Sequence, residues 1–528
     1  MLINFLKRSR LIGYAITTLS LLLLLWSNSP VLAQGTTSES PPADTPGSIT
    51  PYLNRAIERV TEFTLENGMK FIVMENHDAP VVSFVTYADV GGTDEPDGKT
   101  GVAHFLEHLA FKGTTQIGTT NYAEEQKSLD RLDQLFTQMK AAKAAGKEEE
   151  AQKIAEAFAE AQTEASKYIE QNAFGKIVET AGGVGINAAT SADFTVYFYS
   201  FPSNKLELWM SLESERFLDP VFREFYKEQN VILEERRMRT ENSPVGKMVE
   251  AFIGTAFTEH PYQRPVIGYN EDIRNLNRED VRTFFETYYG PGNITMAVVG
   301  DVEPEQVQQF AEVYFGRYPA KSDPPQVTAV EPKQAETREV TLELESQPWY
   351  LEGYHRPALS HPDNAIYEVM ANLLSSGRTS RLYQSLVQEK QVALVAQGFN
   401  GFPGDKYPNL MLFYAQTSPQ ASVEQVAEAL SVEIEKLKTK PVSTKELERV
   451  KNQLRAGLLR SLDSNLGMAR ALAEYEVKTG GWRNLFDQIE AIESVTADDI
   501  QRVAQGTFTT ENRTIGRILP KTETPTDN

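Results

Sequence analysis

The 528-residue chain contains no cysteine and only six histidines. The absence of cysteine excludes disulfide bonds, thiol catalysis, zinc sites built from thiolates and a lipoprotein anchor. If the chain binds a metal ion, the side-chain ligands must therefore come from histidine, aspartate and glutamate.

Basic residues are few relative to acidic ones. The chain has 52 lysines and arginines against 73 aspartates and glutamates, which gives a net charge of −21. An acidic chain repels phosphate, so neither nucleic acid nor anionic lipid is an expected partner. The hydrophobic content of 41% is that of an ordinary globular protein.

Long apolar runs are absent except at the N-terminus. Lys7, Arg8 and Arg10 precede an apolar stretch over residues 11–26, and the small residue Ala33 follows. This layout is typical of a secretory signal cleaved after Ala33. A retained membrane anchor is the alternative, but the run is shorter than the roughly 20 residues of a full span. We expect an exported protein, periplasmic or extracellular, with no stable membrane span after processing.

Two segments of the chain repeat. Residues 273–280 align without gaps to residues 492–499, and in both places an acidic helix start is followed by an apolar strand. The match predicts duplicated domains, although helix-then-strand endings can resemble one another by chance. The expected organisation is a signal peptide over 1–33, a flexible tether over 34–58, a first domain over 59–318, a proline-rich linker over 319–336, a homologous second domain over 337–520 and a tail over 521–528.

Both predicted domains combine short apolar strands with long amphipathic helices. The patterns predict strands over 71–74, 81–85, 195–199, 294–299 and 514–519, and helices over 206–217 and 225–238. These elements show no repeating β-α-β order. We therefore predict an α+β fold in which each domain has a largely antiparallel sheet with helices packed on it.

One segment of the first domain, residues 121–172, lacks strand formers and is rich in alanine and charged residues. Apolar residues recur at helical spacing on both sides of Gly146. We predict an inserted hairpin of two antiparallel helices joined at Gly146. The pattern leaves open whether the hairpin is a plain surface feature or serves to dock a partner or gate a site.

Two of the six histidines flank a glutamate in the sequence His104-Phe-Leu-Glu107-His108. On a helix, His104 and His108 project from one face, so both imidazoles can reach one tetrahedral metal ion. Glu107 would lie beside that ion and could take a proton from water. The alternative is a solvated helix turn with two incidental histidines. The apolar residues on both sides instead indicate a buried helix, where unpaired polar groups are costly.

Two histidines leave such a site one ligand short, since hydrolytic zinc usually takes three protein ligands and a water molecule. The predicted helix over 225–238 offers Glu228 and Glu235, which point nearly the same way at about 100° per residue, whereas Glu234 points elsewhere. One ligand and one carboxylate that supports a ligand would have this arrangement. On this pattern alone, a solvated helix face remains the better explanation.

A family resemblance bears on this choice. Three parts of the chain carry it: the block HFLEHLAFKGT over residues 104–114, Gly183 with Asn187-Ala188 and Thr190-Ser191, and the segment 228–235. Together they resemble the pitrilysin/insulinase-type zinc peptidases, and among these the mitochondrial-processing-peptidase group. The resemblance extends over about residues 59–520. It implies two homologous domains that form half of a clamshell, with a second such half as partner.

The resemblance also implies roles for individual residues. By it, His104, His108 and Glu235 would bind one zinc ion per chain, and Glu107 would act as general base. Glu228 would support a ligand. The implied activity is that of a zinc metalloendopeptidase, in which zinc makes water a better nucleophile and Glu107 transfers its proton.

A further implied feature is an edge strand over 183–190 that pairs with the substrate backbone. Gly183, Asn187 and Ala188 would be its substrate-binding residues. Because strand addition depends on main-chain hydrogen bonds, the expected substrate is an extended or unfolded peptide.

The chain departs from the family in one way that bears on partners. Family members often carry an arginine and a tyrosine, seven residues apart, that hold the substrate carbonyl, but those positions fall here on Val387 and Leu394. Arg381 and Tyr383 match a structural part of the same segment and are not candidates. We expect a homologous partner subunit, in a heterodimer or a homodimer. The alternative function is a non-catalytic scaffold or assembly subunit.

Overall fold

The computed structural model describes residues 50–521. The expected signal peptide, the tether up to residue 49 and the tail from residue 522 lie outside the described residues. Within the described range, no helix is long and apolar enough to cross a membrane.

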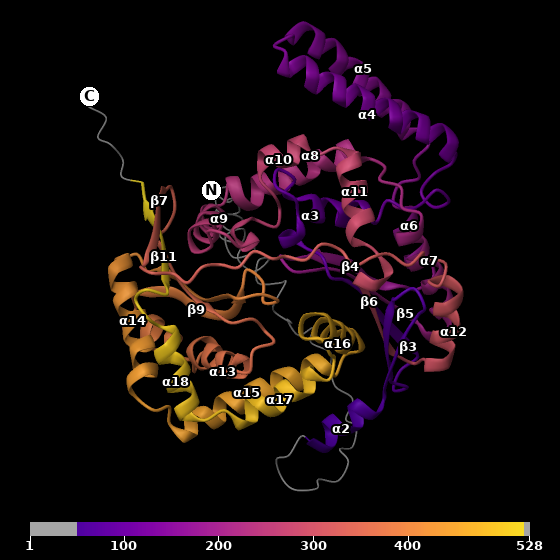
Figure 1. Ribbon diagram of the computed structural model, residues 1–528. Helices are drawn as coiled ribbons and strands as arrows, with labels where there is room; N and C mark the ends of the chain where they lie inside the picture. Colours follow the sequence, from indigo (N-terminus) through magenta and orange to yellow (C-terminus); the bar gives the residue numbers. More distant parts are fainter. Residues whose placement is uncertain (1–49, 522–528) are drawn as a thin grey trace, which may run out of the picture.

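The described chain forms two mixed sheets flanked by helices (Figure 1). The first sheet has the order β1-β2-β6-β3-β5-β4 and consists of β1 (Val60–Thr64), β2 (Lys70–Glu75), β3 (Val81–Ala88), β4 (Val184–Thr190), β5 (Thr195–Pro202) and β6 (Ile294–Gly300). The second has the order β7-β11-β8-β10-β9 and consists of β7 (Arg338–Leu344), β8 (Trp349–Arg356), β9 (Ala393–Phe402), β10 (Asn409–Thr417) and β11 (Arg513–Pro520).

The second sheet has the same topology as five strands of the first, in which β1 is an additional strand. Strands β2, β3, β4, β5 and β6 correspond in order to β7, β8, β9, β10 and β11. In each sheet a single neighbouring pair, β2–β6 or β7–β11, is parallel, and the other pairs are antiparallel. The predicted α+β fold with two largely antiparallel sheets is confirmed.

Helices of the first domain are α2 (Thr50–Glu58), α3 (Val102–Leu109), α4 (Tyr122–Ala144), α5 (Glu148–Ser166), α6 (Ala173–Thr180), α7 (Leu206–Leu218), α8 (Phe225–Arg236), α9 (Pro244–Ala256), α10 (Asn270–Asn275), α11 (Arg278–Tyr288) and α12 (Pro304–Tyr314). Helices of the second are α13 (Asn364–Ser375), α14 (Val423–Thr439), α15 (Thr444–Leu462), α16 (Asn465–Thr479), α17 (Asn484–Ser494) and α18 (Ala497–Thr507).

The repeated residues cap equivalent helices. Asn277 and Asp280 form a capping box at the start of α11, and Thr496 and Asp499 form one at α18.

Two helices at equivalent places, α9 and α16, are exchanged between the domains. Met248 and Phe252 of α9 are fully buried against the face of the second sheet that α13, α14 and α18 do not cover. Helix α16, with Leu472, is buried in the same way against the first sheet. Gly353 and Gly516 permit the close approach of α9, because a β-carbon there would lie 2.9 Å from Phe252 and 2.8 Å from Met248. Each sheet therefore depends on a helix from the other domain.

The prediction of a flexible tether over 34–58 is wrong for residues 50–58. Residues 50–58 form α2, and Leu53 and Ala56 are buried in the cluster that α16 and the first sheet also share. Helix α2 is stabilised there because its apolar face packs against the first sheet and α16. The amino-acid composition of the segment does not reveal this tertiary contact.

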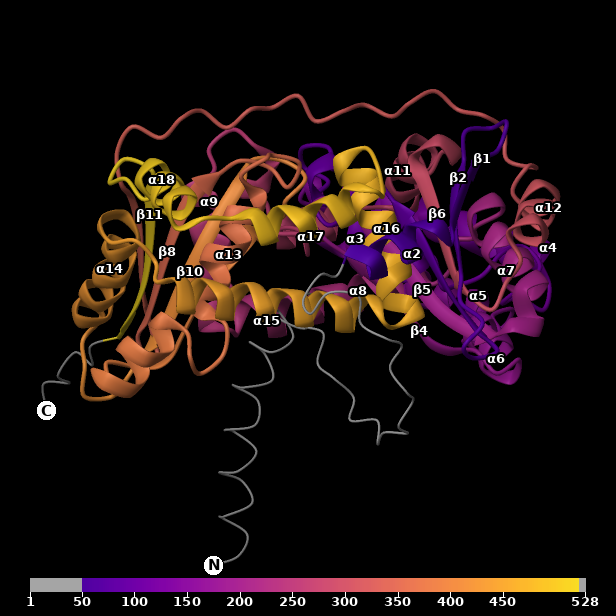
Figure 2. The same cartoon turned by 90° about the horizontal axis from the view of Figure 1, so that it is seen from below.

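Polar contacts also join the domains, close to β4. The carboxylate of Asp193, in the turn between β4 and β5, accepts the amide hydrogens of Asp405 at 2.7 Å and Lys406 at 3.0 Å. The linker crosses between the domains as extended chain (Figure 2). Glu331 in this linker accepts the amide hydrogens of Thr258 and His260. Because Asp193 bonds to Asp405 and Lys406, the second domain holds the turn after β4 in place.

The predicted hairpin is present as α4 and α5, which project from the rest of the first domain (Figure 1). Gly146, between the helices, has φ of +67°. The middle of the hairpin packs on α8, where the ring of Tyr226 lies 4.8 Å from Phe136 and 5.0 Å from Phe158. Buried Arg223 pairs with Glu125 at 2.7 Å and ties the hairpin to the start of α8.

Candidate metal centre

Helix α3, which carries the His-x-x-Glu-His residues, is held at its start and on its side. The buried carboxylate of Glu95 accepts the amide hydrogens of Gly101 and Ala103, each at 2.9 Å. The ring of Phe105 stacks on that of Phe225 with centroids 4.4 Å apart, which joins α3 to α8. The two helices that supply the predicted ligands are therefore in direct contact.

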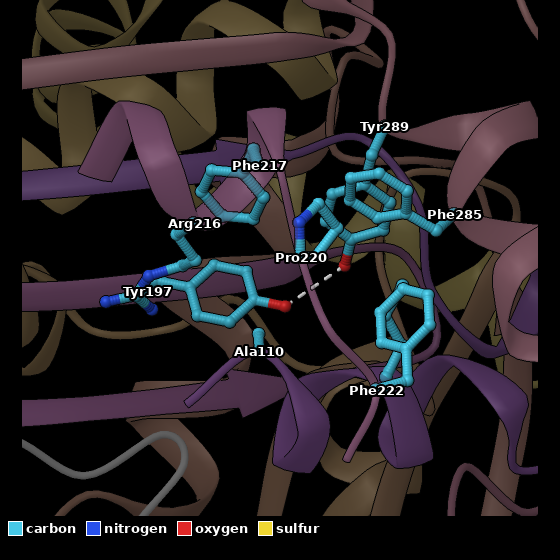
Figure 3. A pocket seen from close by; sticks show the side chains of 9 residues that line it. Ala110, Tyr197, Arg216, Phe217, Pro220, Phe222, Phe285 and Tyr289 are labelled. Atoms are coloured by element: carbon cyan, nitrogen blue, oxygen red, sulfur yellow. Dashed lines mark hydrogen bonds between the residues drawn. The ribbon is translucent and has the colours of Figure 1, made fainter. Parts of the chain in front are cut away.

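The opposite side of α3 faces an apolar interior. Figure 3 shows a small pocket there, lined by Ala110 and aromatic rings, in which the hydroxyls of Tyr197 and Tyr289 face each other at 3.2 Å. The guanidinium of buried Arg216 lies over the ring of Phe174 and pairs with Glu213 at 3.2 Å. This side of α3 contains neither histidine of the motif and packs into the core of the first domain.

The structure brings His104, His108 and Glu235 together. One nitrogen of each imidazole and one carboxylate oxygen all lie within 4.8 Å of one another. Oε2 of Glu235 is 3.9 Å from Nε2 of His104 and 3.7 Å from Nε2 of His108. Glu234, by contrast, is half exposed and pairs with Arg237.

These three donors fit a zinc ion. Zinc binds imidazole nitrogen and carboxylate oxygen at about 2.0–2.2 Å in a tetrahedral arrangement, which places neighbouring donors about 3.4 Å apart. The distances from Oε2 of Glu235 to the two imidazole nitrogens, 3.9 and 3.7 Å, are within about 0.5 Å of that value. Three protein ligands also leave a fourth position for water, as in hydrolytic zinc sites.

Glu228, the predicted supporting carboxylate, lies against His108. Its Oε2 is 3.3 Å from Nδ1 of His108, and its Oε1 accepts a hydrogen bond from the ammonium group of Lys112. Lys112 also pairs with Glu224 at 3.0 Å. Such contacts fix the orientation of a ligand ring and which of its nitrogens is free to bind metal.

The pKa values of the two histidines are shifted in opposite directions, although burial lowers both. It lowers the pKa of His104 to about 3, with smaller contributions from His108 and Arg239, so His104 is neutral at physiological pH. For His108 burial alone would lower the pKa, but the hydrogen bond to Glu228 and the charge of Glu107 outweigh it and raise the pKa. Metal binding requires a neutral imidazole, so it would release the proton of a charged His108.

Glu107 lies beside the three donors and at the end of β4. Its Oε2 accepts a hydrogen bond of 2.5 Å from the hydroxyl of Thr190, the last residue of that strand. Burial raises the pKa of Glu107, and the Thr190 hydrogen bond partly opposes this rise. A raised pKa strengthens a carboxylate as a proton acceptor.

Two of the three predicted substrate-binding residues, Asn187 and Ala188, lie on β4, which has a free edge because β5 is its one neighbour among the described residues. Asn187 is exposed and Ala188 is half buried. Gly183 lies just before the strand, where a β-carbon would come within 2.4 Å of Val178. Close packing therefore accounts for this glycine, while Asn187 and Ala188 are at the open edge.

The positions of the expected arginine–tyrosine pair carry side chains of another kind. Val387 is half buried against the core of the second domain, and Leu394 is 50% exposed on β9. Arg381 is engaged by Glu446 through two hydrogen bonds of 2.9 and 2.8 Å, so it is not free to contact a substrate.

Sequence reasoning did not single out four residues that contact this site or its helix: Glu95, Lys112, Thr190 and Arg239. Lys112 and Thr190 belong to the segments that carry the family resemblance, which was their only signal. Glu95 and Arg239 gave none, because their contacts depend on how the loop and helix ends pack.

Comparison with known protein families gives a match in each of the two domains. The family model described as "Insulinase (Peptidase family M16)" matches residues 70–139 and 160–269, and the model "Peptidase M16 inactive domain" matches residues 275–454. Together they match more than half of the chain. The chain belongs to the insulinase family, peptidase family M16.

Curated and solved relatives of this M16 chain are similar over most of its length. "Zinc protease PqqE" of Helicobacter pylori is 29% identical over 453 residues, which is 84% of this chain and 89% of the relative. A probable beta subunit of the mitochondrial-processing peptidase of Arabidopsis thaliana is 24% identical and covers 89% of this chain and 80% of its own. The crystal structure of a protease from Helicobacter pylori superposes with a TM-score of 0.74 at 28% identity, covering 87% of this chain and 99% of that one.

The matched ranges agree with the architecture. The insulinase model skips residues 140–159, which form the far end of the α4–α5 hairpin. Helix α3 lies between β3 and β4, and α13 lies between the corresponding strands β8 and β9 of the second domain. Helix α13 contains no histidine. Within the described chain, the first domain alone has the metal-binding pattern.

Exchanging Glu228 for glutamine tests the support of His108. We expect Glu228→Gln to weaken zinc binding by about 10–100-fold, the usual cost of removing a partner behind a ligand. The measurement is competition with a chelator of known affinity. Glu234→Gln is the matched control on the same helix and should bind zinc as the wild type does; equal losses in both variants would contradict the assignment.

Proposed function

We propose that this M16 chain is the metal-bearing subunit of an exported zinc endopeptidase, which hydrolyses peptide bonds in extended or unfolded peptides. The observation that carries the proposal is the meeting of three donors with one carboxylate. His104, His108 and Glu235 converge within 4.8 Å, and Glu107 lies beside them, bonded to the end of the open-edged strand β4.

The roles of the side chains follow from their positions. His104, His108 and Glu235 would hold the ion, and Glu228 would orient the ring of His108. A zinc ion there would polarise a peptide carbonyl and lower the pKa of a water molecule toward about 7. Glu107 would accept the proton of the attacking water on Oε1, since Thr190 holds Oε2, and would return it to the leaving amine.

The geometry of β4 favours a substrate in extended form. A peptide that adds to its free edge gains main-chain hydrogen bonds with little demand on sequence. Because Thr190 at the end of β4 bonds to Glu107, a peptide on this edge would pass beside the proton acceptor. An extended or unfolded peptide satisfies this requirement, whereas a folded surface does not.

A homologous partner subunit forms part of the proposal. The donor set for hydrolysis is complete, but Val387 and Leu394 cannot hold a substrate carbonyl. Holding the reacting groups in place can contribute about 7–11 kcal/mol to lowering a barrier. We propose a heterodimer in which the partner supplies the arginine–tyrosine pair; two copies of this chain would lack it.

Export is proposed from the N-terminal signal, which lies outside the described residues. The competing function is a non-catalytic scaffold of the same family, which Val387 and Leu394 favour. The intact set of His104, Glu107 and His108 argues against it, because a scaffold needs no proton acceptor beside three metal donors.

Glu107→Gln should abolish peptide hydrolysis and leave zinc in place, because glutamine cannot accept the proton and residue 107 is not among the three donors. Zinc content by elemental analysis and turnover of a casein or peptide pool measure the two properties separately. Glu235→Gln is the comparison variant and should lose zinc and activity together. Activity of Glu107→Gln within tenfold of the wild type would rule out the proton-transfer role.

The purified chain alone should bind zinc and cleave peptides only weakly. Adding a partner captured from the native source should raise the rate by orders of magnitude, because the partner positions the substrate. The measurement is the rate of peptide cleavage at increasing partner concentration. Full activity from a homogeneous preparation of the single chain would refute the heterodimer.

A further inference from the structure

An arginine contacts the third donor of the proposed metal site, the carboxylate of Glu235. Nη1 of Arg239 is 2.8 Å from Oε1 of Glu235, while Oε2 of the same carboxylate is the oxygen closest to both imidazoles. The two oxygens of Glu235 thus have separate partners. Arg239 remains 54% exposed and Glu235 is 15% exposed.

The backbone at Arg239 is held in place by an irregular turn. After α8 ends at Arg236, residues Arg237–Glu241 form a π turn, in which the amide of Asn242 bonds to the carbonyl of Arg237 at 2.8 Å. Single π turns are rare within helices and are frequent at functional sites. Here the turn directs the guanidinium back toward Glu235.

The start of α9 fixes this turn from the other side. A β-carbon on Gly246 would lie 2.0 Å from the carbonyl oxygen of Arg239, so a larger residue could not occupy position 246 without displacing the turn. Glu241, at the end of the turn, accepts a hydrogen bond of 2.7 Å from Asn270. The contact between Arg239 and Glu235 therefore starts from a backbone that is packed on both sides.

We propose that Arg239 is a positioning residue for Glu235, which it holds so that a single oxygen, Oε2, is presented to the metal ion. This proposal rests on the proposed zinc site. A free glutamate can rotate and can offer either or both oxygens to a cation. With Oε1 engaged by a guanidinium, one rotamer and one donor oxygen remain, and the space that the second oxygen would take stays open for water or substrate.

A neighbouring ion pair provides a matched control. Arg237 pairs with Glu234 at the same helix end, and both side chains are about half exposed, at 50% and 52%. Removing either arginine takes one positive charge from the same turn. Only Arg239 contacts one of the three donors.

The test measures metal binding rather than activity. Arg239→Ala should weaken zinc binding by about 10–100-fold in competition with a chelator, in the range seen when a partner behind a ligand is removed. Arg239→Lys keeps a cationic donor near Oε1 and should recover most of the loss. Arg237→Ala should bind zinc as the wild type does. Unchanged affinity in Arg239→Ala, or an equal loss in Arg237→Ala, would overturn the proposal.

The visible spectrum of the cobalt-substituted protein separates positioning from a general structural effect. Freeing Oε1 in Arg239→Ala lets Glu235 bind through both oxygens, which raises the coordination number and weakens the cobalt absorption bands. Bands identical to those of the wild type would overturn the proposal. Failure of the wild-type chain to bind zinc or cobalt would instead refute the zinc site itself.

Discussion

Helices α3 and α8 supply all three donors of the candidate site, and the stacked rings of Phe105 and Phe225 hold these helices together. Each helix has a further support at one end. Glu95 binds the amides at the start of α3, and Arg223 ties the start of α8 to Glu125 in the hairpin. The distances between the imidazoles and Glu235 depend on these contacts, so the packing of two helices sets the chemistry of the site.

The geometry of the candidate site also depends on contacts with the second domain. Helix α9 follows the turn that carries Arg239 and is buried against the second sheet, while the turn after β4 is bonded to the loop at Asp405 and Lys406. Both the donor helix and the open-edged strand are thus fixed from across the domain boundary. A domain without metal-binding residues of its own, within the described chain, still shapes the site.

Local sequence patterns were sufficient to predict much of the fold and of the candidate site. Histidines four residues apart on a helix must share a face, and short apolar stretches identified β2, β3, β5 and β6 to within three residues at their ends. The placement of Glu235 and β4 needed the family resemblance, because the contacts that bring them to α3 join distant parts of the chain. The exchange of α9 and α16, the helix α2 and the contact of Arg239 could not be predicted. Each depends on which surface is left uncovered once the sheets have formed.

The most direct test of the account is the position of the metal. Crystals of the zinc-loaded chain, measured at the zinc absorption edge, should give one strong anomalous peak. The account places that peak between Nε2 of His104, Nε2 of His108 and Oε2 of Glu235. A zinc peak at any other position, or zinc-loaded crystals without a peak among these three atoms, would contradict the central claim.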